Sequence, residues 1–265
     1  MIALDAMLIT AGAATGMLVG LTGVGGGAVM TPLLLLVFGV APVSAIGTDL
    51  WFAAITKLVA TRVHHGNGLI DWQVVRRLWA GSLPASVLTL AWMATAPIDA
   101  STAGFLKAMI AAALLLTSVA MLFQKQLHGL GRKLRLEQAD QFKSLQGPLT
   151  MAAGALLGFL VTLTSIGAGA LGVVFLAYLY PLRLTPARLI ATDIVHAIPL
   201  AMFAGAGHLL MGNVDIALLG NLLIGSIPGV LAGALLSSRL PQVVLRRALS
   251  AILLFTGLKL LHLAG

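Results

Sequence analysis

Two aspartates inside long apolar stretches are the residues of this sequence best suited to chemistry. Asp49 follows Thr48, and 144 residues later Asp193 follows Thr192 in a second copy of the same pair. Ionisable side chains are rare in membrane-spanning segments, where they usually mark the path of a substrate, an ion or a proton. The threonine hydroxyls can donate hydrogen bonds to an anion, which an ionised carboxylate cannot do. We therefore expect both pairs to line one binding site; the alternative is a structural acid paired with a lysine or a backbone group.

These pairs belong to an internal repeat. Sliding the chain against itself by 144 residues gives 17 identities over the 62 positions from 23 to 84, where composition alone would give about a tenth. The repeat also matches His64 with His208 and Asp71 with Asp215. We expect the two aspartates to cap the helices that follow them. The two histidines should lie at helix ends, with a role in coupling or gating as the alternative.

Each copy contains a glycine-rich break, followed by an apolar segment, 28–41 or 170–181, that is short for a full membrane span. The simplest interpretation is a short, broken or re-entrant helix. Its amino end would present free N–H donors and a partial positive charge, which suit an anionic ligand. The candidate binding residues of the breaks are Gly23, Gly25, Gly26 and Gly27 in the first copy and Ser165, Gly167 and Gly169 in the second.

Other glycines recur at four-residue spacing, which promotes close packing of membrane helices. We expect two such series to lie at helix contacts. They are Gly12, Gly16 and Gly20, and Gly225, Gly229 and Gly233.

Two basic side chains accompany the acids. Lys57 lies two helical turns after Asp49 and has no counterpart, because residue 201 is alanine. It can extend to the membrane surface, neutralise Asp49 or attract an anion, and the sequence favours none of the three. His196 lies three residues after Asp193, on the same helical face. It is a candidate for proton coupling, and a satisfied core histidine is the alternative.

The composition determines which elements must position these residues. Of 265 residues, 59% are hydrophobic and 9% are charged, and the mean hydropathy is +1.04. A soluble domain of this length has too little interior to bury so much apolar surface. We therefore expect an all-α polytopic membrane protein with about eight transmembrane helices plus the two broken or re-entrant segments. The bacterial cytoplasmic membrane is the expected location of such a bundle.

Basic residues predict how the chain crosses the membrane. The net charge of +8 is spread over the breaks between apolar segments, which favours cytoplasmic loops over a nucleic-acid surface. A polar linker, 124–147, should be cytoplasmic and divides a first repeat, 1–123, from a second, 148–265. The basic loop 62–77 matches 206–221, which contains no Lys or Arg. Matching loops with opposite charge bias predict two inverted-topology repeats, with both termini outside.

Motifs of enzymes and metal sites are missing from the sequence. The first glycine break lacks the Gly-Lys-Ser/Thr of a nucleotide loop, and the chain has no HExxH motif, no Gly-x-Ser-x-Gly motif and no cysteine. The class we expect is a transporter rather than an enzyme. Two alternatives stay open: an anion channel, or a cation or metal transporter with Asp49 and Asp193 as ligands.

At these residues the chain resembles the sulfite exporter TauE/SafE family of membrane transporters, also called the toluenesulfonate uptake permeases. The likeness covers nearly the whole length. It implies a cofactor-free secondary transporter for small sulfur-containing anions such as sulfite and sulfonates, working by alternating access and able to use a coupling proton. The motifs that carry it are Gly20-Leu-Thr-Gly-Val-Gly-Gly-Gly27, Ile46-Gly-Thr-Asp-Leu50, Thr56-Lys57, His64, Ala191-Thr-Asp-Ile194, His196-Ala-Ile-Pro199, Gly212-Asn-Val-Asp215 and Gly225-Ser-Ile-Pro228.

Overall fold

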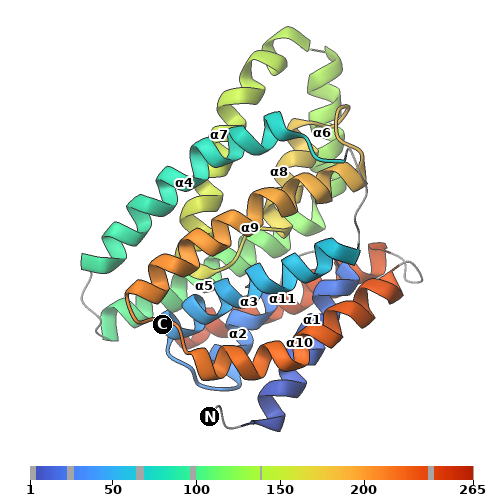
Figure 1. Ribbon diagram of the computed structural model, residues 1–265. Coiled ribbons are helices and arrows are strands. Elements are labelled where there is room, and N and C mark those ends of the chain that lie inside the picture. The colour runs from blue at the N-terminus through green and yellow to red at the C-terminus, as the bar shows by residue number, and fades with distance from the viewer. Residues whose placement is uncertain are drawn as a thin grey trace.

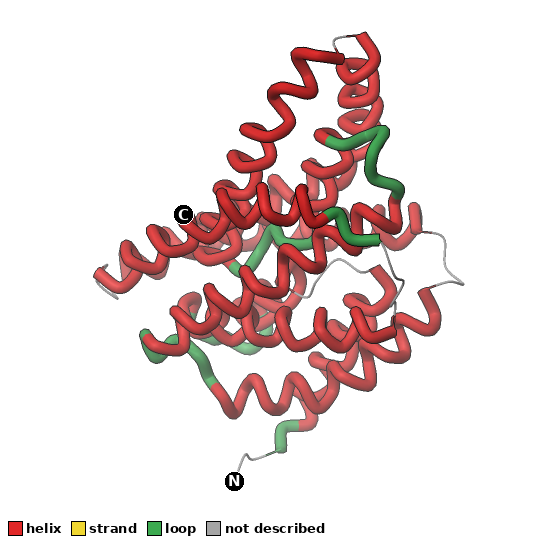
Figure 2. Tube along the Cα trace, turned by 45° about the horizontal axis from the view of Figure 1, so that its top comes forward, coloured by secondary structure: helices red, strands yellow, loops and turns green. Residues whose placement is uncertain are grey.

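A computed structural model describes residues 4–22, 27–63, 69–95, 100–137, 139–237 and 242–264. Helices joined by short loops make up this part of the chain, which contains no strand (Figures 1 and 2). The expected all-α fold is confirmed. The helices are α1 Ala6–Thr22, α2 Gly27–Leu36, α3 Pro42–Val63, α4 Trp72–Thr95, α5 Ala100–Leu122, α6 Gln124–Glu137, α7 Ala139–Thr164, α8 Ala170–Leu179, α9 Pro186–Leu210, α10 Ile216–Leu236 and α11 Gln242–Ala264.

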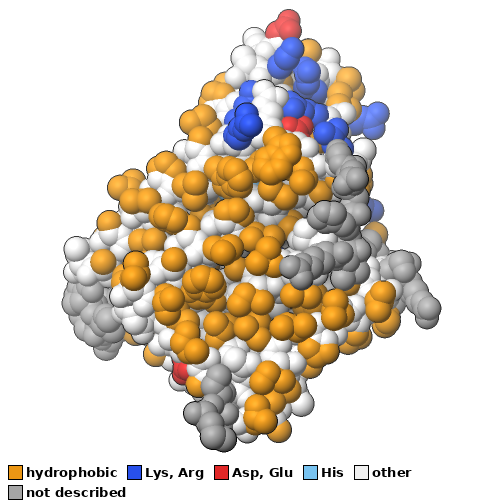
Figure 3. Space-filling view, viewed as in Figure 1, with side chains coloured by type: hydrophobic (Ala, Val, Ile, Leu, Met, Phe, Trp, Pro, Cys, Tyr) orange, Lys and Arg blue, Asp and Glu red, His pale blue; other side chains and the backbone are white. Residues whose placement is uncertain are grey.

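Six helices of the described chain are long and apolar enough to cross a membrane: α3, α4, α5, α7, α9 and α10. The sequence predicts about eight transmembrane helices; two further helices, α1 with 17 residues and α11 with 23, are not among these six. Large apolar side chains such as Leu88, Leu210 and Phe255 lie exposed on the outside of the bundle, where lipid would cover them. Figure 3 shows hydrophobic side chains, in orange, over much of the visible face. The fold is that of a polytopic membrane protein.

The two short segments are also present. Helices α2 and α8 have 10 residues each, so each covers about 15 Å, or half of the hydrocarbon thickness. Each follows a longer helix, α1 or α7, after a glycine-rich break. The second break places Gly167 and Gly169 at φ of 122° and 115° and Ser165 at 61°. Glycine is needed at the first two of these positions, since an L side chain would be strained there.

Matched helices of the two copies run antiparallel. Gly47, near the start of α3, lies against His208, near the end of α9. Further along α3, Lys57 interacts with Asp193 near the start of α9. The order of these contacts is reversed between the two helices, so α3 and α9 point in opposite directions (Figure 1).

Helices α5 and α11 are related in the same way. The Ser118 hydroxyl donates to the Ser250 carbonyl at 2.8 Å, and Leu115, one turn earlier in α5, packs against Gly257, two turns later in α11. Two matched pairs that run antiparallel are what an inverted-topology repeat requires. The structure therefore agrees with the inversion that the charge bias predicts.

Glycines bring helices from opposite copies into backbone contact. A Cβ atom on Gly16 of α1 would overlap the carbonyl oxygen of Ser226 in α10, and one on Gly225 would overlap that of Ile9. The same holds for the other members of both predicted glycine series, which confirms them as packing positions. Because no Cβ intervenes, the two backbones approach closely and gain dispersion contacts that lipid cannot replace.

Helices α4 and α7 form the equivalent pair, with a shifted register. Gly12 of α1 packs on Leu222, and Gly154 of α7 packs on Leu78. The leucines are 144 residues apart, whereas the glycines are 142 apart. The second copy therefore has two more residues between this helix and the glycine break. A single shift of 144 cannot align α1 with α7, which is why this shift gives only two scattered identities before residue 23.

One end of the bundle carries most of the visible basic residues, coloured blue in Figure 3. The segment 124–147, expected as a polar linker, is mostly helical: it forms α6 and the first turns of α7, which project from the bundle (Figure 1). Helix α6 is tied to α8, because His128 Nδ1 lies 3.1 Å from the Ala177 carbonyl oxygen. We call this part of the molecule the basic end; its residues are Lys125, Arg132, Lys133, Arg135 and Lys143.

Candidate substrate site

A lysine and two aspartates come together in the interior. The exposed fractions of Asp49, Lys57 and Asp193 are 0%, 3% and 1%. The Lys57 ammonium interacts electrostatically with both carboxylates and donates to the carbonyl oxygen of Ala168 at 3.1 Å. Neither carboxylate forms a direct ion pair with it within the described residues. We call Asp49, Lys57 and Asp193 the buried triad. It joins α3 of the first copy to α9 and the glycine break of the second.

Asp49 is held from one side only. The hydroxyl of Thr31 in α2 donates to Asp49 Oδ2, while Oδ1 is buried without a hydrogen bond to any described residue. Ser165, in the second break, lies beside Asp49, and its own buried hydroxyl also has no hydrogen-bond partner in the described chain. Burying unpaired polar atoms is costly. A pair of them at one place indicates a position where a ligand or water completes the hydrogen bonds.

Asp193 faces the start of α8. Its carboxylate lies at the backbone N–H of Gly169, and a Cβ atom on Gly172 would overlap Asp193 Oδ1. Glycine at position 172 therefore leaves the room in which the carboxylate sits. The same Oδ1 is buried with no hydrogen bond from the described residues, like Oδ1 of Asp49.

His196 extends the buried triad by one residue. It is fully buried and interacts electrostatically with Lys57. Its Nε2 lies 3.0 Å from the hydroxyl of Ser82 in α4. Its Nδ1 is buried and has no partner among the described residues, so this nitrogen is available to a ligand or a proton.

Thr48 and Thr192 tie each copy to the other. The Thr48 hydroxyl accepts a hydrogen bond from the Asp215 N–H at 3.0 Å, and the Thr192 hydroxyl accepts one from the Asp71 N–H at 3.1 Å. Both side chains are fully buried. Each hydroxyl keeps its proton for donation. The two threonines thus hold the amino ends of α10 and α4 beside the buried triad.

Asp71 and Asp215 cap these helices, as expected. The Val74 N–H donates to Asp71 Oδ1 at 3.3 Å, and the Leu218 N–H donates to Asp215 Oδ1 at 2.9 Å. Asp71 has a second partner, since Arg183 binds both of its carboxylate oxygens at 2.6 and 2.9 Å. The position that matches Arg183 in the first copy is Gly39. This ion pair between the copies is therefore asymmetric.

The remaining predicted residues lie apart or outside the described chain. His208 is buried in α9, with Nε2 at 3.0 Å from the Thr162 carbonyl oxygen and Nδ1 at 3.5 Å from the Asn213 amide nitrogen. It links α9 to α7 rather than to the buried triad. His64 and the glycines of the first break, Gly23, Gly25 and Gly26, lie outside the described residues, and Gly27 begins α2.

Sequence reasoning did not identify three residues at this site. Thr31 and Gly172 stand in apolar runs with no motif around them, and only the packing of α2 and α8 brings them to the acids. Ser82 had a signal, because it belongs to the repeated Gly-Ser-x-Pro stretch with Ser226. Within the described chain, no three His, Asp or Glu side chains are grouped so that they could hold a metal ion.

A bundle of membrane helices in two inverted halves, with a buried charged cluster between them, has the architecture of a secondary transporter. The comparisons with known proteins agree. The family model described as Sulfite exporter TauE/SafE matches residues 8–260, and the chain belongs to this family. It is 37% identical over 257 residues to the "Probable membrane transporter protein YjnA" of Bacillus subtilis (strain 168), covering 96% of this chain and 98% of the relative. No solved structure matches.

Proposed function

We propose that this protein is a secondary transporter that moves small sulfur-containing anions, such as sulfite or sulfonates, across the bacterial cytoplasmic membrane by alternating access. The observation that carries the proposal is the buried triad, in which Lys57 interacts electrostatically with both Asp49 and Asp193 where the two halves meet. The description of the family, as sulfite exporters, supports the sulfur chemistry. No cofactor is part of the proposal; the partners are the anion, the bilayer and a coupling proton.

The charges of the buried triad explain how an anion and a proton would be coupled. Two carboxylates and one ammonium have a net charge of −1, and an anion added to them in a poorly solvated interior would be repelled. A proton on one carboxylate removes this excess and frees Lys57 to bind the anion. Loading of the anion therefore requires a proton, for which Asp49, Asp193 and the free Nδ1 of His196 are the candidate carriers.

Candidate hydrogen-bond donors for the anion lie on the segments that carry the buried triad. The Gly169 N–H and the Ser165 hydroxyl come from the second break, and the protons of the Thr48 and Thr192 hydroxyls come from the cross-links between the copies. By the repeat, Gly23 to Gly27 would supply N–H groups from the first copy, and Gly167 allows the turn that exposes the second set. Anion sites at broken membrane helices use such backbone donors.

The same geometry weakens the case for a cation or metal transporter. The Lys57 ammonium already interacts with both acids, so a second cation would have to displace it. His64 and His208 would act in gating rather than in binding, His208 through its bond to Thr162. In the proposed orientation the basic end faces the cytoplasm, following the positive-inside rule, and both termini face outward.

The test is flux in proteoliposomes made with the purified protein. Sulfite and methanesulfonate are applied in turn, with chloride and acetate as controls, with and without a pH gradient. We expect the flux of the sulfur anions to saturate with concentration. An opposing proton gradient should reverse the direction of this flux. Flux that rises linearly with concentration and ignores the gradient would identify a channel. Absence of flux for every sulfur anion would reject the substrate class.

A further inference from the structure

A small cavity lies between the buried triad and the basic end of the molecule. Its volume is about 50 Å³, and it is bounded by the end of α1, the junction of α5 and α6, and the starts of α8, α9 and α11. Thr22, the last described residue before the first glycine break, and Gly169, in the second break, both line it. Gly169 also supplies a donor to the proposed substrate site, and Lys57 binds the carbonyl of the adjacent Ala168, so the cavity reaches the edge of that site.

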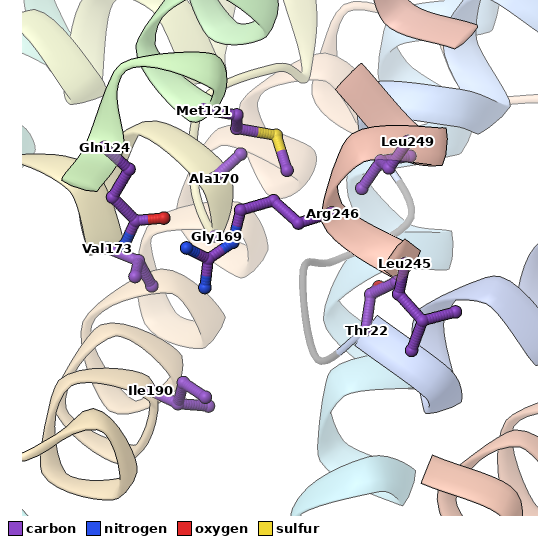
Figure 4. A pocket seen from close by; sticks show the side chains of 10 residues that line it. All are labelled: Thr22, Met121, Gln124, Gly169, Ala170, Val173, Ile190, Leu245, Arg246 and Leu249. Carbon is purple, nitrogen blue, oxygen red and sulfur yellow. The ribbon is translucent and has the colours of Figure 1, made fainter. Parts of the chain in front are cut away.

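Arg246 is the charged residue of this cavity. Figure 4 shows its side chain extending from α11 across the cavity, with the guanidinium beside Gly169 and directed toward Gln124. The guanidinium forms no ion pair or hydrogen bond with the described residues, whereas Arg183 on the same side of the bundle is fully paired. An arginine held in a cavity without a counter-ion is suited to bind an oxyanion with two parallel hydrogen bonds.

Gln124 provides a second, independent indication of a ligand. This residue is only 9% exposed, and its side chain lines the same cavity as Arg246 (Figure 4). Its carboxamide makes no hydrogen bond to any described residue. Its amide group lines the cavity instead of bonding to the described chain, so a polar guest between it and the guanidinium would complete its hydrogen bonds. The walls formed by Met121, Val173 and Leu245 are apolar and would accommodate a short carbon group.

The other copy has no equivalent charge. The position 144 residues before Arg246 is Thr102, which lines a separate cavity together with Trp92, Leu106 and Asn213. That cavity contains no charged side chain in the described chain. Both cavities lie at the starts of matched helices, α5 and α11, and because the copies are inverted they lie on opposite sides of the bundle. Of these two cavities in the described chain, the one at Arg246 carries a charge that suits an anion.

From these contacts we infer that Arg246 and Gln124 form a vestibule site, which holds the oxyanion group of the substrate on the basic side before it reaches Lys57 or after it leaves. The site rests on the proposed function for the identity of the anion. It predicts that the substrate binds with different strength from the two sides of the membrane.

The experiment compares Arg246→Gln with Arg247→Gln, which removes the same charge from the exposed neighbouring side chain. Half-saturating concentrations of sulfite and methanesulfonate are measured from each side of proteoliposomes. The chain has no cysteine, so labelling of Lys133→Cys shows which side carries the basic end. We expect Arg246→Gln to raise the half-saturating concentration on the basic side about tenfold or more, as for loss of one charge-assisted hydrogen bond. On the other side the half-saturating concentration should change little.

Three outcomes separate the two proposals. If the unmodified protein transports the sulfur anions and Arg246→Gln behaves as Arg247→Gln does, the vestibule site is wrong and the proposed function stands. If the unmodified protein transports none of them, the proposed function fails and the vestibule site with it. Gln124→Leu is measured as well, in case Arg246→Gln does not fold. If its half-saturating concentration on the basic side equals that of the unmodified protein, the vestibule site is wrong.

Discussion

At the scale of single residues, the interior contains the three ionisable side chains of the buried triad, Asp49, Lys57 and Asp193, although burying each of them is costly. A charged side chain at the centre of a membrane helix costs about 2.5–3.5 kcal/mol even on insertion scales. Direct ion pairs would recover part of this cost, yet Lys57 bonds a carbonyl, and Oδ1 of both aspartates has no partner among the described residues. This arrangement is poor for stability and suitable for a site that must accept and release a ligand.

Thr48 and Thr192 have a structural task that can be measured separately. Valine at either position would leave a buried N–H, of Asp215 or Asp71, without its acceptor. We expect each change to lower the free energy of unfolding by about 1–3 kcal/mol, seen as a lower melting temperature in detergent. The control is Thr117→Val, because the Thr117 hydroxyl bonds only within its own helix. Equal melting temperatures for all three variants would show that the cross-links contribute nothing.

The sequence predicted part of this site and could not predict the rest. Asp49, Asp193 and their threonines stand out because a repeated acid in an apolar run has few explanations. The role of Lys57 could not be chosen among three, since its partners, Ala168 and Asp193, are more than a hundred residues away. Which side chains meet at a crossing of two helices depends on their rotation, and one sequence does not contain that information.

At the scale of elements, glycine decides how close the helices lie. Gly225 of α10 touches the backbone of α1, whereas Gly104 of α5 has no atom within 4 Å of where a Cβ would be. We expect Gly225→Ala to force α1 and α10 apart and to lower the free energy of unfolding by about 1–3 kcal/mol.

Gly104→Ala is the matched control. Its free energy of unfolding should stay within about 1 kcal/mol of that of the unmodified protein, because alanine favours a helix and its Cβ contacts no other atom there. Thermal unfolding of both variants in detergent measures the difference. A Gly225→Ala variant as stable as Gly104→Ala would contradict the close contact.

Elements were the easiest level to predict. Long apolar runs bounded by glycine, proline and charge gave the long helices, and the breaks gave α2 and α8. The segment 124–147 was less clear, because its charges indicate a surface location but not whether it is coiled or helical. Its leucines recur with the basic residues at helical spacing, as in the stretch Leu127 to Leu136, which is a signal for the amphipathic helix that α6 forms.

At the scale of the whole molecule, the two inverted copies are nearly symmetric in their helices and asymmetric in their charges. In the other copy, uncharged residues occupy the positions that match Lys57, Arg183 and Arg246. They are Ala201, Gly39 and Thr102. The symmetry provides two related arrangements for alternating access. The charges make the two sides different, so one fold can favour binding from one side.

The most direct test of the central claim is equilibrium binding of sulfite to the purified protein, comparing Lys57→Met with Lys259→Met. Both changes remove one ammonium, from the interior in the first case and from the exposed face of α11 in the second. We predict saturable binding by the unmodified protein and by Lys259→Met, and affinity at least about a hundredfold weaker for Lys57→Met, as for loss of a buried charge partner. Unchanged affinity in a folded Lys57→Met protein would contradict it.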